Sequence, residues 1–258
     1  PPGSVFKTVT LAAAIENIPD LFSRTWTCTG STVVGGETIT CPHAHGALDI
    51  SSALANSCNG VFAQLAAELG PERMKQYTEQ AGLTASYSVS GLHTAAGRFD
   101  FSGTTGQLGW AGVGQYNDLA NPCAIMVYMG AIAQGGKTAV PELVLKTVNP
   151  LGLPSLPTLT SRTKSLINAD TAATMADMMA KNVTDTYGAS RFPNMDICAK
   201  SGTAEVGGGK APHAWFAGFL RNEDAPYAFV VLVENGGSGA DVAGSVAAKV
   251  LDALVNGY

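Results

Sequence analysis

The chain has 258 residues, of which 46% are hydrophobic and 14% are charged, and its formal net charge is −5. A chain of this length and composition can bury one substantial core, or form two lobes around one site, and does not belong to the disordered class. The acidic balance, without a cluster of Lys and Arg, excludes nucleic acid as a partner. The longest apolar runs, such as AFVVLV at 228–233, are too short to cross a membrane, so we expect any export signal or anchor to lie outside these residues.

The first predicted helix follows a Pro-Pro-Gly turn. Ser4 comes directly after the turn and Lys7 three residues later, in the apolar run 5–16. Residues three apart lie on the same face of a helix, so the two side chains are predicted neighbours. One interpretation makes Ser4 a helix cap and Lys7 a solvated side chain. The apolar flanks of Lys7 favour the other, in which a desolvated lysine acts as a base toward a serine nucleophile.

A β-hairpin is predicted between Cys28 and Cys41, with its turn at Gly35 and Gly36. We predict that the two sulfurs are bonded, or lie within bonding distance, across this hairpin in an exported protein. A reducing compartment would leave two thiols.

The run CPHAHG places Cys41 close to His43 and His45. This spacing matches no standard zinc module and no second ligand pair follows, so we predict no metal site. Cys123 and Cys198 lie in apolar stretches and are predicted to be small core residues.

Helices dominate the middle of the chain. Asp49 is predicted to cap a short helix, and Pro71 to begin another, because proline is favoured in the first helical turn. Residues 86–120 are rich in Gly, Ser and Thr and are predicted to form a long ordered loop. Their GVGQ run lacks the third glycine of a dinucleotide fingerprint, so a Rossmann site is rejected. The predicted helices are 50–57, 61–70, 71–82, 121–136 and 168–183, with a Pro- and Leu-rich connector at 148–159.

Three strand-like runs and a final helix close the chain. Short connections favour antiparallel neighbours, so the runs are predicted to form an antiparallel sheet that the last helix covers. The runs are residues 195–206, 213–221 and 227–235, and the helix is 241–258.

Two further polar clusters interrupt apolar segments. Ser57 and Asn59 stand one residue apart in a break between two helices, where such residues are also common as ordinary loop and cap residues. Lys200 ends an apolar stretch and begins the run KSGT. A lysine there is unfavourable unless it lines a cleft or meets an anion, and Gly202 would let a ligand backbone pair closely with the strand.

The chain therefore carries three motifs in the order S-x-x-K, S-x-N and K-[ST]-G. In this order they resemble the penicillin-binding transpeptidases, which share the set with serine β-lactamases. The stretches SALANSCNGVFAQLA, AIAQGGKTAVPELV and AWFAGF also look like this family, so the resemblance covers nearly the whole chain. Among the branches, it looks most like the transpeptidase domain of the high-molecular-weight enzymes. The motif residues are Ser4, Lys7, Ser57, Asn59, Lys200, Ser201, Gly202 and Thr203.

The resemblance implies an α/β (α+β) fold of the β-lactamase/transpeptidase type. An antiparallel sheet covered by helices and a mostly helical lobe would hold the active site between them. Residues 1–258 would form one transpeptidase domain. Family members have sheet strands and a linking segment before the first motif, and only three residues precede it here. We therefore predict that residues N-terminal to Pro1 complete the sheet and lead to any upstream domain or anchor.

The resemblance also implies catalytic roles for four residues. Ser4 would attack a D-Ala-D-Ala carbonyl and hold the acyl group, while neutral Lys7 takes its proton. Ser57 would relay a proton between the lysines and the leaving amine. Lys200 would supply positive potential for the terminal carboxylate of the substrate.

The remaining motif residues are implied to bind substrate. Asn59 would hydrogen-bond the substrate amide, and the hydroxyls of Ser201 and Thr203 would contact the carboxylate, with Gly202 between them. The backbone N–H groups of Ser4 and Thr203 would form the oxyanion hole.

The implied activity is that of a peptidoglycan D,D-transpeptidase, which cross-links stem peptides through an acyl-enzyme on Ser4 and is inhibited by β-lactams. No cofactor and no metal are implied. The expected partners are peptidoglycan stem peptides, β-lactam antibiotics and cell-wall synthesis proteins. The expected location is the extracytoplasmic face of the bacterial cell membrane, with the anchor outside this chain.

Three alternative functions stay open. A D,D-carboxypeptidase shares every motif residue and differs in whether water or an amine accepts the acyl group. A β-lactamase needs a base for deacylation; Glu205 is the nearest candidate in the sequence, but we expect the strand geometry to turn it away. A β-lactam sensor domain is acylated without turnover. Such sensors more often resemble class D enzymes, whose second motif ends in Val, so Asn59 argues against this option.

Overall fold

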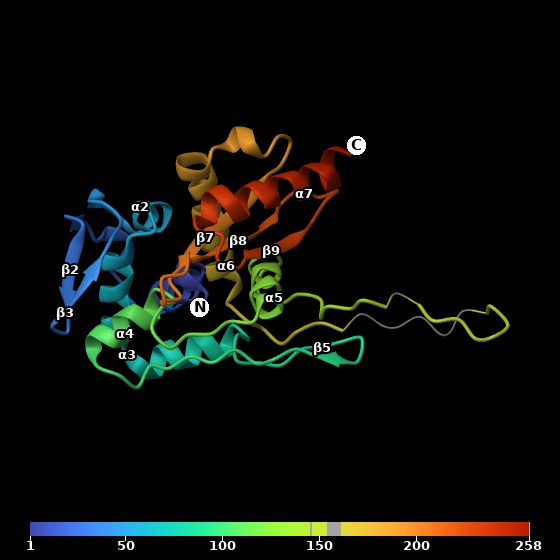
Figure 1. The fold of residues 1–258 in the computed structure, drawn as a ribbon, viewed down its shortest axis with the longest axis horizontal. Helices are drawn as coiled ribbons and strands as arrows, with labels where there is room; N and C mark the ends of the chain where they lie inside the picture. The colour runs from blue at the N-terminus through green and yellow to red at the C-terminus, as the bar shows by residue number, and fades with distance from the viewer. Residues whose placement is uncertain (145, 154–160, 258) are drawn as a thin grey trace.

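The computed structural model describes residues 1–144, 146–153 and 161–257. At its centre is an antiparallel sheet in which β8 (His213–Leu220) lies between β7 (Ile197–Ala204) and β9 (Ala228–Val233) (Figure 1). These strands are the three runs predicted from the sequence, and their short connections give the predicted antiparallel pairing.

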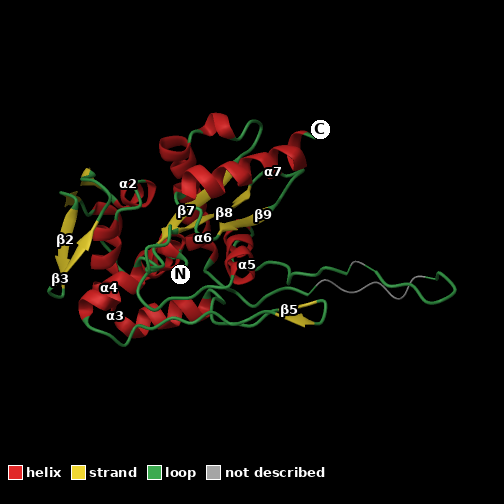
Figure 2. Ribbon diagram, in the orientation of Figure 1, coloured by secondary structure: helices red, strands yellow, loops and turns green. Residues whose placement is uncertain are grey.

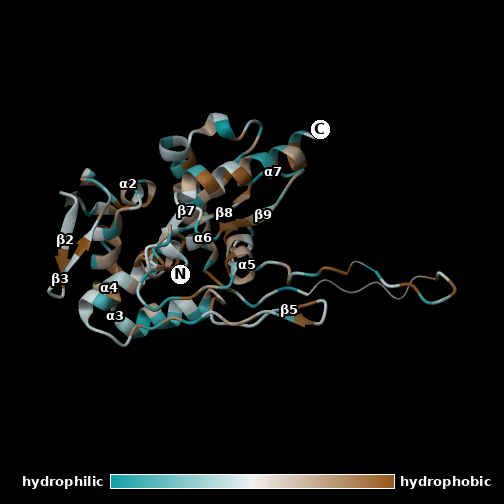
Figure 3. Cartoon of the chain, in the orientation of Figure 1, coloured by the Kyte–Doolittle hydropathy of each residue, from teal (hydrophilic) through white to brown (hydrophobic). Residues whose placement is uncertain are grey.

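Helices cover both faces of this sheet. One face buries Cys198, Trp215 and Phe219 against helices α5 and α6. The other buries Phe216 and Leu220 with residues of α7. Because both faces are covered, seven of the eight residues of β8 are buried. The neighbouring strand β9 is hydrophobic along its whole length (Figure 3). The helices are α5 (Pro122–Ala133), α6 (Ala169–Asn182) and α7 (Gly244–Asn256), corresponding to the predicted helices 121–136, 168–183 and 241–258.

A mostly helical lobe lies on the β7 side of the sheet (Figure 1). Helix α1 (Lys7–Asn17) packs on α3 (Asn59–Gln80), and α3 packs on α4 (Thr105–Gly112). Helix α3 joins the two predicted helices 61–70 and 71–82, which meet at a kink where Gly70 has a φ of 78°. The short α2 (Ile50–Ala55) begins at Asp49, whose side chain accepts a hydrogen bond from the Ser52 N–H, as the predicted cap requires.

The predicted loop 86–120 is partly wrong, because it contains helix α4. Glycine is a poor helix former, and three glycines in eight residues hid this helix. Thr104 and Gln107 form a capping box at its start. The glycines also let α4 approach α3 closely, since a Cβ on Gly112 would lie only 2.2 Å from the Cβ of Ala66.

The predicted hairpin forms, but the predicted disulfide does not. Strands β2 and β3 pair across the two-glycine turn, whereas Cys28 and Cys41 are free thiols. The N–H of Cys41 donates to the carbonyl of Gly30, so the hairpin places Gly30, not Cys28, opposite Cys41. Cys28 ends β1, which pairs with β4 instead. The small strands are β1 (Trp26–Cys28), β2 (Ser31–Val34), β3 (Glu37–Thr40), β4 (Gly46–Leu48), β5 (Ser88–Val89) and β6 (Leu92–His93).

The chain leaves α5 in a long loop that projects from the body of the protein (Figure 2). The predicted connector 148–159 begins in this loop, and its residues 154–159 lie outside the described residues. None of the described helices has both the length and the apolar character that a membrane crossing needs.

Candidate active site

A cavity of about 660 Å³ lies where the sheet meets the helical lobe. Its lining comes from the N-terminal turn, the break between α2 and α3, the end of β3 and the edge strand β7. Five predicted site residues line it, namely Ser4, Ser57, Asn59, Ser201 and Thr203.

Ser4 lies in a 3₁₀ turn, η1 (Gly3–Val5), that leads into α1. Gly3 has a φ of 54°, and its N–H donates to the carbonyl of Gly114 over 2.9 Å. A Cβ on Gly3 would lie 3.0 Å from the carbonyl oxygen of Thr203, so a side chain would crowd the strand as well as strain the backbone. This glycine therefore fixes Ser4 between the end of α4 and strand β7.

Lys7, one turn beyond Ser4, has no solvent exposure. Its Nζ lies 3.0 Å from Ser4 Oγ and 3.1 Å from Ser57 Oγ. The same Nζ lies 2.6 Å from the Ser57 carbonyl oxygen and 2.7 Å from Asn59 Oδ1. Burial lowers the pKa of Lys7 to about 7, because the ammonium form is disfavoured away from water. A substantial fraction of this amine is therefore neutral near pH 7, as a base toward Ser4 requires.

Ser57 connects Lys7 to a second buried lysine. Its φ of 53° turns the chain between α2 and α3 and aims its hydroxyl at Lys200, whose Nζ lies 3.0 Å from Ser57 Oγ. Lys200 also has no solvent exposure, and burial together with repulsion from Lys7 holds its pKa well below the usual range. Because both lysines contact one hydroxyl, their two positive charges disfavour each other. Protonation of one lysine therefore disfavours protonation of the other.

Asn59, at the start of α3, is held from two sides. Its Nδ2 donates to the carbonyl oxygen of Thr40 over 2.7 Å, and its Oδ1 accepts from Lys7. The amide therefore joins the end of β3 to the buried lysine while lining the cavity.

The third motif lies on β7, and its alternate residues face opposite ways. Lys200 points toward Ser57, whereas Ser201 contacts Tyr187 on the other side of the strand. The Tyr187 hydroxyl donates to Ser201 Oγ over 3.0 Å and accepts from the Ser201 N–H over 2.9 Å. Thr203 Oγ1 accepts from a backbone N–H over 3.1 Å. Sequence reasoning missed Tyr187, because it lies in a π-helical turn (Val183–Tyr187) outside any motif.

Gly202 lies against the N-terminal turn, which leaves no room for a side chain. A Cβ there would lie 2.8 Å from the Pro2 carbonyl oxygen and 3.1 Å from a methyl carbon of Val5. The N-terminal turn therefore fills the space on the face of β7 at Gly202, and pairing of a ligand backbone along the edge of this strand stays a prediction. Gly202 and Gly3 together let this turn rest on β7.

Glu205 lies in the wall of the same cavity as Ser4. The expectation that strand geometry turns it away is wrong, because Glu205 follows the alternation of Ser201 and Thr203, which line the same cavity.

Similarity to known proteins extends over the same elements. Residues 1–255 match the family model described as the penicillin binding protein transpeptidase domain. The chain belongs to this family. The peptidoglycan D,D-transpeptidase PbpA of Mycolicibacterium smegmatis is 29% identical over 264 residues, covering 96% of this chain and 52% of that protein.

Solved structures of this family share the fold. A ceftriaxone acyl-enzyme complex of penicillin-binding protein A from Mycobacterium tuberculosis superposes with a TM-score of 0.90 at 25% identity, covering 99% of this chain and 60% of that one. A peptidoglycan synthase complex contains a chain that superposes with a TM-score of 0.81 at 25% identity, covering 98% of this chain and 45% of that one. The predicted transpeptidase-like fold is confirmed. The chain spans about half the length of the curated relatives it matches.

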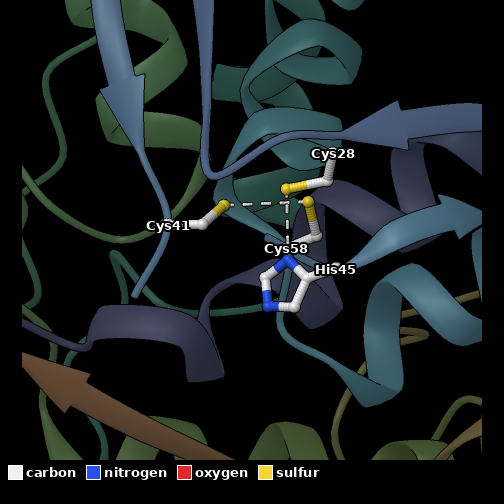
Figure 4. A group of neighbouring side chains, drawn as sticks. All are labelled: Cys28, Cys41, His45 and Cys58. Atoms are coloured by element: carbon white, nitrogen blue, oxygen red, sulfur yellow. Dashed lines mark hydrogen bonds between the residues drawn. The ribbon is translucent and has the colours of Figure 1, made fainter. Parts of the chain in front are cut away.

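This penicillin-binding protein transpeptidase domain carries a second group of reactive side chains beside the cavity. Cys28, Cys41, His45 and Cys58 place their sulfur and nitrogen atoms within 4.8 Å of one another (Figure 4). Cys41 and His45 also line the cavity. The sequence does not reveal this group, because Cys58 lies inside the S-x-N motif and only the fold brings it to the other three side chains.

Proposed function

We propose that this chain is the catalytic domain of a peptidoglycan D,D-transpeptidase that forms an acyl-enzyme on Ser4 and is inhibited by β-lactams. One observation carries the proposal: a continuous series of contacts runs from Ser4 Oγ through Lys7 Nζ and Ser57 Oγ to Lys200 Nζ. The similarity to named D,D-transpeptidases and to a β-lactam acyl-enzyme supports it.

The contact between Ser4 and Lys7 supports the acylation step. Ser4 Oγ attacks the carbonyl carbon of the penultimate D-Ala, and the hydroxyl proton passes to the neutral amine of Lys7. As the C–N bond breaks, the departing amine needs a proton. Ser57 Oγ, 3.1 Å from Lys7 Nζ, is the group that can pass the proton on to it. The products are free D-Ala and an ester on Ser4.

The substrate carboxylate is assigned to the end of the cavity at β7. Lys200 supplies positive potential there, and binding of an anion beside it favours the protonated amine. Ser201 and Thr203, on the other side of the strand from Lys200, line the cavity and are assigned to the carboxylate, and Asn59 in the same lining is assigned to the substrate amide. The roles of these residues rest on their motif positions and on this arrangement.

The oxyanion hole is assigned to the backbone N–H groups of Ser4 and Thr203. Gly3 packs against the Thr203 backbone, which supports the close approach of the two stretches of chain that this pair of donors needs.

Deacylation by an amine distinguishes the transpeptidase from its alternatives. The acceptor amine of a second stem peptide attacks the ester carbon, its extra proton passes to Lys7, and Ser4 regains its hydroxyl hydrogen. With water as acceptor, the same residues would give a D,D-carboxypeptidase. The amine reaction is favoured here because the similar proteins are named transpeptidases.

The partners and location follow from this activity. The donor and acceptor are peptidoglycan stem peptides, which lie outside the cytoplasmic membrane. The likeness to a chain of a peptidoglycan synthase complex supports cell-wall synthesis proteins as further partners. The anchor that would hold the domain at the extracytoplasmic face is assigned to polypeptide beyond these residues.

Labelled penicillin tests the proposal directly. We expect a stable covalent adduct that peptide mass spectrometry places on Ser4, lost in Ser4→Ala and kept in the control Ser31→Ala, an exposed serine of β2. A label on another serine would overturn the assignment.

Release of D-Ala from a pentapeptide, with and without an added amine, then separates the related functions. Amine-dependent product formation supports the transpeptidase, and equal release into water identifies a carboxypeptidase. Rapid hydrolysis of penicillin, lost in Glu205→Gln, would identify a β-lactamase. A stable penicillin adduct without any D-Ala release would identify a sensor.

A further inference from the structure

The four side chains beside the cavity have the composition of a zinc site. Three thiols and one imidazole converge from separate elements: the end of β1, the residue after β3, the loop before β4 and the N-cap of α3 (Figure 4). Among the described residues this is the one group of three or more potential metal ligands drawn together. Soft thiolates with one imidazole favour Zn²⁺ over Mg²⁺, Ca²⁺ or Mn²⁺.

The distances agree with tetrahedral coordination. Zn–S bonds of about 2.3 Å and Zn–N bonds of about 2.0 Å place neighbouring ligand atoms about 3.5–3.8 Å apart in a tetrahedron. The Sγ atoms of Cys41 and Cys58 lie 3.8 Å apart, and Cys28 Sγ lies 3.3 Å from His45 Nδ1. A disulfide needs a sulfur separation of about 2.05 Å, so the Cys41–Cys58 pair has the spacing of ligands and not of a bond.

We propose that Cys28, Cys41, His45 and Cys58 bind one Zn²⁺ ion that positions the S-x-N motif of the active site. Four protein ligands close a tetrahedral coordination sphere, as in structural zinc sites, whereas a catalytic zinc keeps a position open for water or substrate. The ion therefore takes no part in the reaction itself.

The positioning role follows from what the ligands connect. Cys58 stands between Ser57 and Asn59, and Cys41 follows Thr40, whose carbonyl accepts from Asn59. A metal bound to both Cys41 and Cys58 would stabilise the hydrogen bond between Thr40 and Asn59, because each ligand is the chain neighbour of one of these residues. It would also hold Ser57 in its left-handed conformation, in which the hydroxyl reaches both lysines. Without the metal, the links from Cys28, Cys41 and His45 to Cys58 at the start of α3 would be lost.

Metal content is the first test, and it does not depend on the proposed function. The intact chain is purified without a polyhistidine tag, under reducing conditions, and its zinc is measured by plasma mass spectrometry. We expect about one zinc per chain. Because loss of an outer-shell partner alone typically costs 10–100-fold in metal affinity, we expect at least about tenfold weaker binding in Cys28→Ser and His45→Asn.

Matched controls come from residues outside the group. Cys123→Ser and His43→Asn should keep full zinc content, although the His43 ring lies 4.5 Å from that of His45. Replacement by Co²⁺ should give the absorption of tetrahedral thiolate-bound cobalt in the wild-type chain and lose it in Cys58→Ser. Three results would overturn the site. The wild-type chain could bind no zinc even after exposure to excess Zn²⁺, or Cys123→Ser could lose as much zinc as the variants of the four ligands. The purified chain could also contain a Cys41–Cys58 disulfide.

The positioning role rests on the proposed acylation of Ser4 and has its own test. Zinc is removed with a chelator, folding is checked by circular dichroism, and acylation by labelled penicillin is timed before and after zinc is restored. We expect acylation at least about tenfold slower without zinc, still on Ser4, and recovery on adding Zn²⁺ back. Unchanged acylation in a zinc-free, folded chain would overturn the positioning role while leaving the zinc site intact. Failure of the zinc-loaded chain to react with penicillin would instead count against the proposed function.

Discussion

Two lysines without solvent exposure face one serine hydroxyl in this protein, and burial is what gives them their chemistry. An exposed lysine stays charged far above pH 7 and is a poor base. Lys7 is surrounded by oxygen acceptors and by the ring of Phe62, whose centroid lies 5.7 Å from its Nζ. Removal from water destabilises the ammonium form more than these contacts stabilise it, so the pKa of Lys7 falls to about 7.

The pH dependence of acylation should therefore report Lys7. Acylation of Ser4 needs the neutral amine, so its rate should rise with pH through about 7 and level off above. The measurement is the rate of labelling by penicillin between pH 5.5 and 9. Lys7→Ala should be slower by about 10²- to 10⁴-fold and should lose this rise, since the base that titrates is gone. A wild-type rate that is flat or falls across this range would contradict the assignment of Lys7 as the base.

A second prediction at this scale concerns Tyr187. Its hydroxyl bonds both the Oγ and the N–H of Ser201, so Tyr187→Phe leaves two polar groups without their partner. We expect a loss of about 1–3 kcal/mol in the free energy of unfolding, measured by urea denaturation. The penicillin concentration for half-maximal acylation rate should rise, because Ser201 is less well held toward the carboxylate. Tyr227→Phe, at an exposed tyrosine, is the control and should stay within about 0.5 kcal/mol. An equal loss in the two variants would show that the Ser201 contacts do not stabilise the fold.

At the scale of elements, the helices and strands with a regular hydrophobic pattern could be predicted, whereas those that depend on close packing could not. The strands of the sheet and helices α1, α5 and α6 follow from apolar runs, and the Asp49 cap follows from local chemistry. Helix α4 escaped prediction because its stability comes from contact with α3, which no local pattern records. The Cys28–Cys41 disulfide failed for a related reason: the β1–β4 pairing that carries Cys28 away from the hairpin involves residues distant in sequence.

The same distinction applies to the candidate site. The order of the three motifs along the chain was enough to assign four catalytic residues, and the structure brings their side chains together. They are Ser4, Lys7, Ser57 and Lys200. Tyr187 could not be assigned, because only the folded chain brings its hydroxyl to Ser201. The grouping of Cys58 with Cys28 likewise depends on how β1 and α3 meet.

The close approach of α4 gives a third prediction. In isolation Gly112→Ala should favour a helix by up to about 1 kcal/mol. Here the new Cβ would lie 2.2 Å from the Cβ of Ala66, so we expect a net loss of about 1–3 kcal/mol in unfolding free energy. The control is Gly244→Ala in α7, where the nearest atom would lie 3.4 Å away and stability should hold or rise. Because the Gly114 carbonyl just beyond α4 holds the Ser4 turn, Gly112→Ala should also slow penicillin acylation. Equal stability of the two variants would show that α4 and α3 can separate without cost.

At the scale of the whole molecule, the two lobes meet at the reactive groups. The N-terminal turn rests on β7 through Gly3 and Gly202, and Lys200 reaches across to Ser57. A large hydrophobic core runs from α3 through α1 to one face of the sheet, and a smaller one lies under α7. The outer side of α7 differs, because Val246, Val250 and Leu254 form an exposed stripe at four-residue spacing. Strand β9 beside α7 pairs with β8 on one side only among the described strands.

We predict that polypeptide N-terminal to Pro1, in a longer form of the protein, pairs with β9 and covers this stripe. An unpaired edge next to an apolar helix face is a favourable site for a further strand.

In residues 1–258 alone, Val250→Lys should change the unfolding free energy by no more than about 0.5 kcal/mol, because Val250 is 52% exposed. In the longer protein the same change would bury an unpaired charge and should cost several times more. Leu251→Ala, at a side chain only 2% exposed, should cost about 2–5 kcal/mol in both forms and serves as the control. Amide hydrogen exchange should slow in β9 on going to the longer form and stay unchanged in the β2–β3 hairpin. Equal cost of Val250→Lys in the two forms, with no added protection of β9, would show that the upstream polypeptide packs elsewhere.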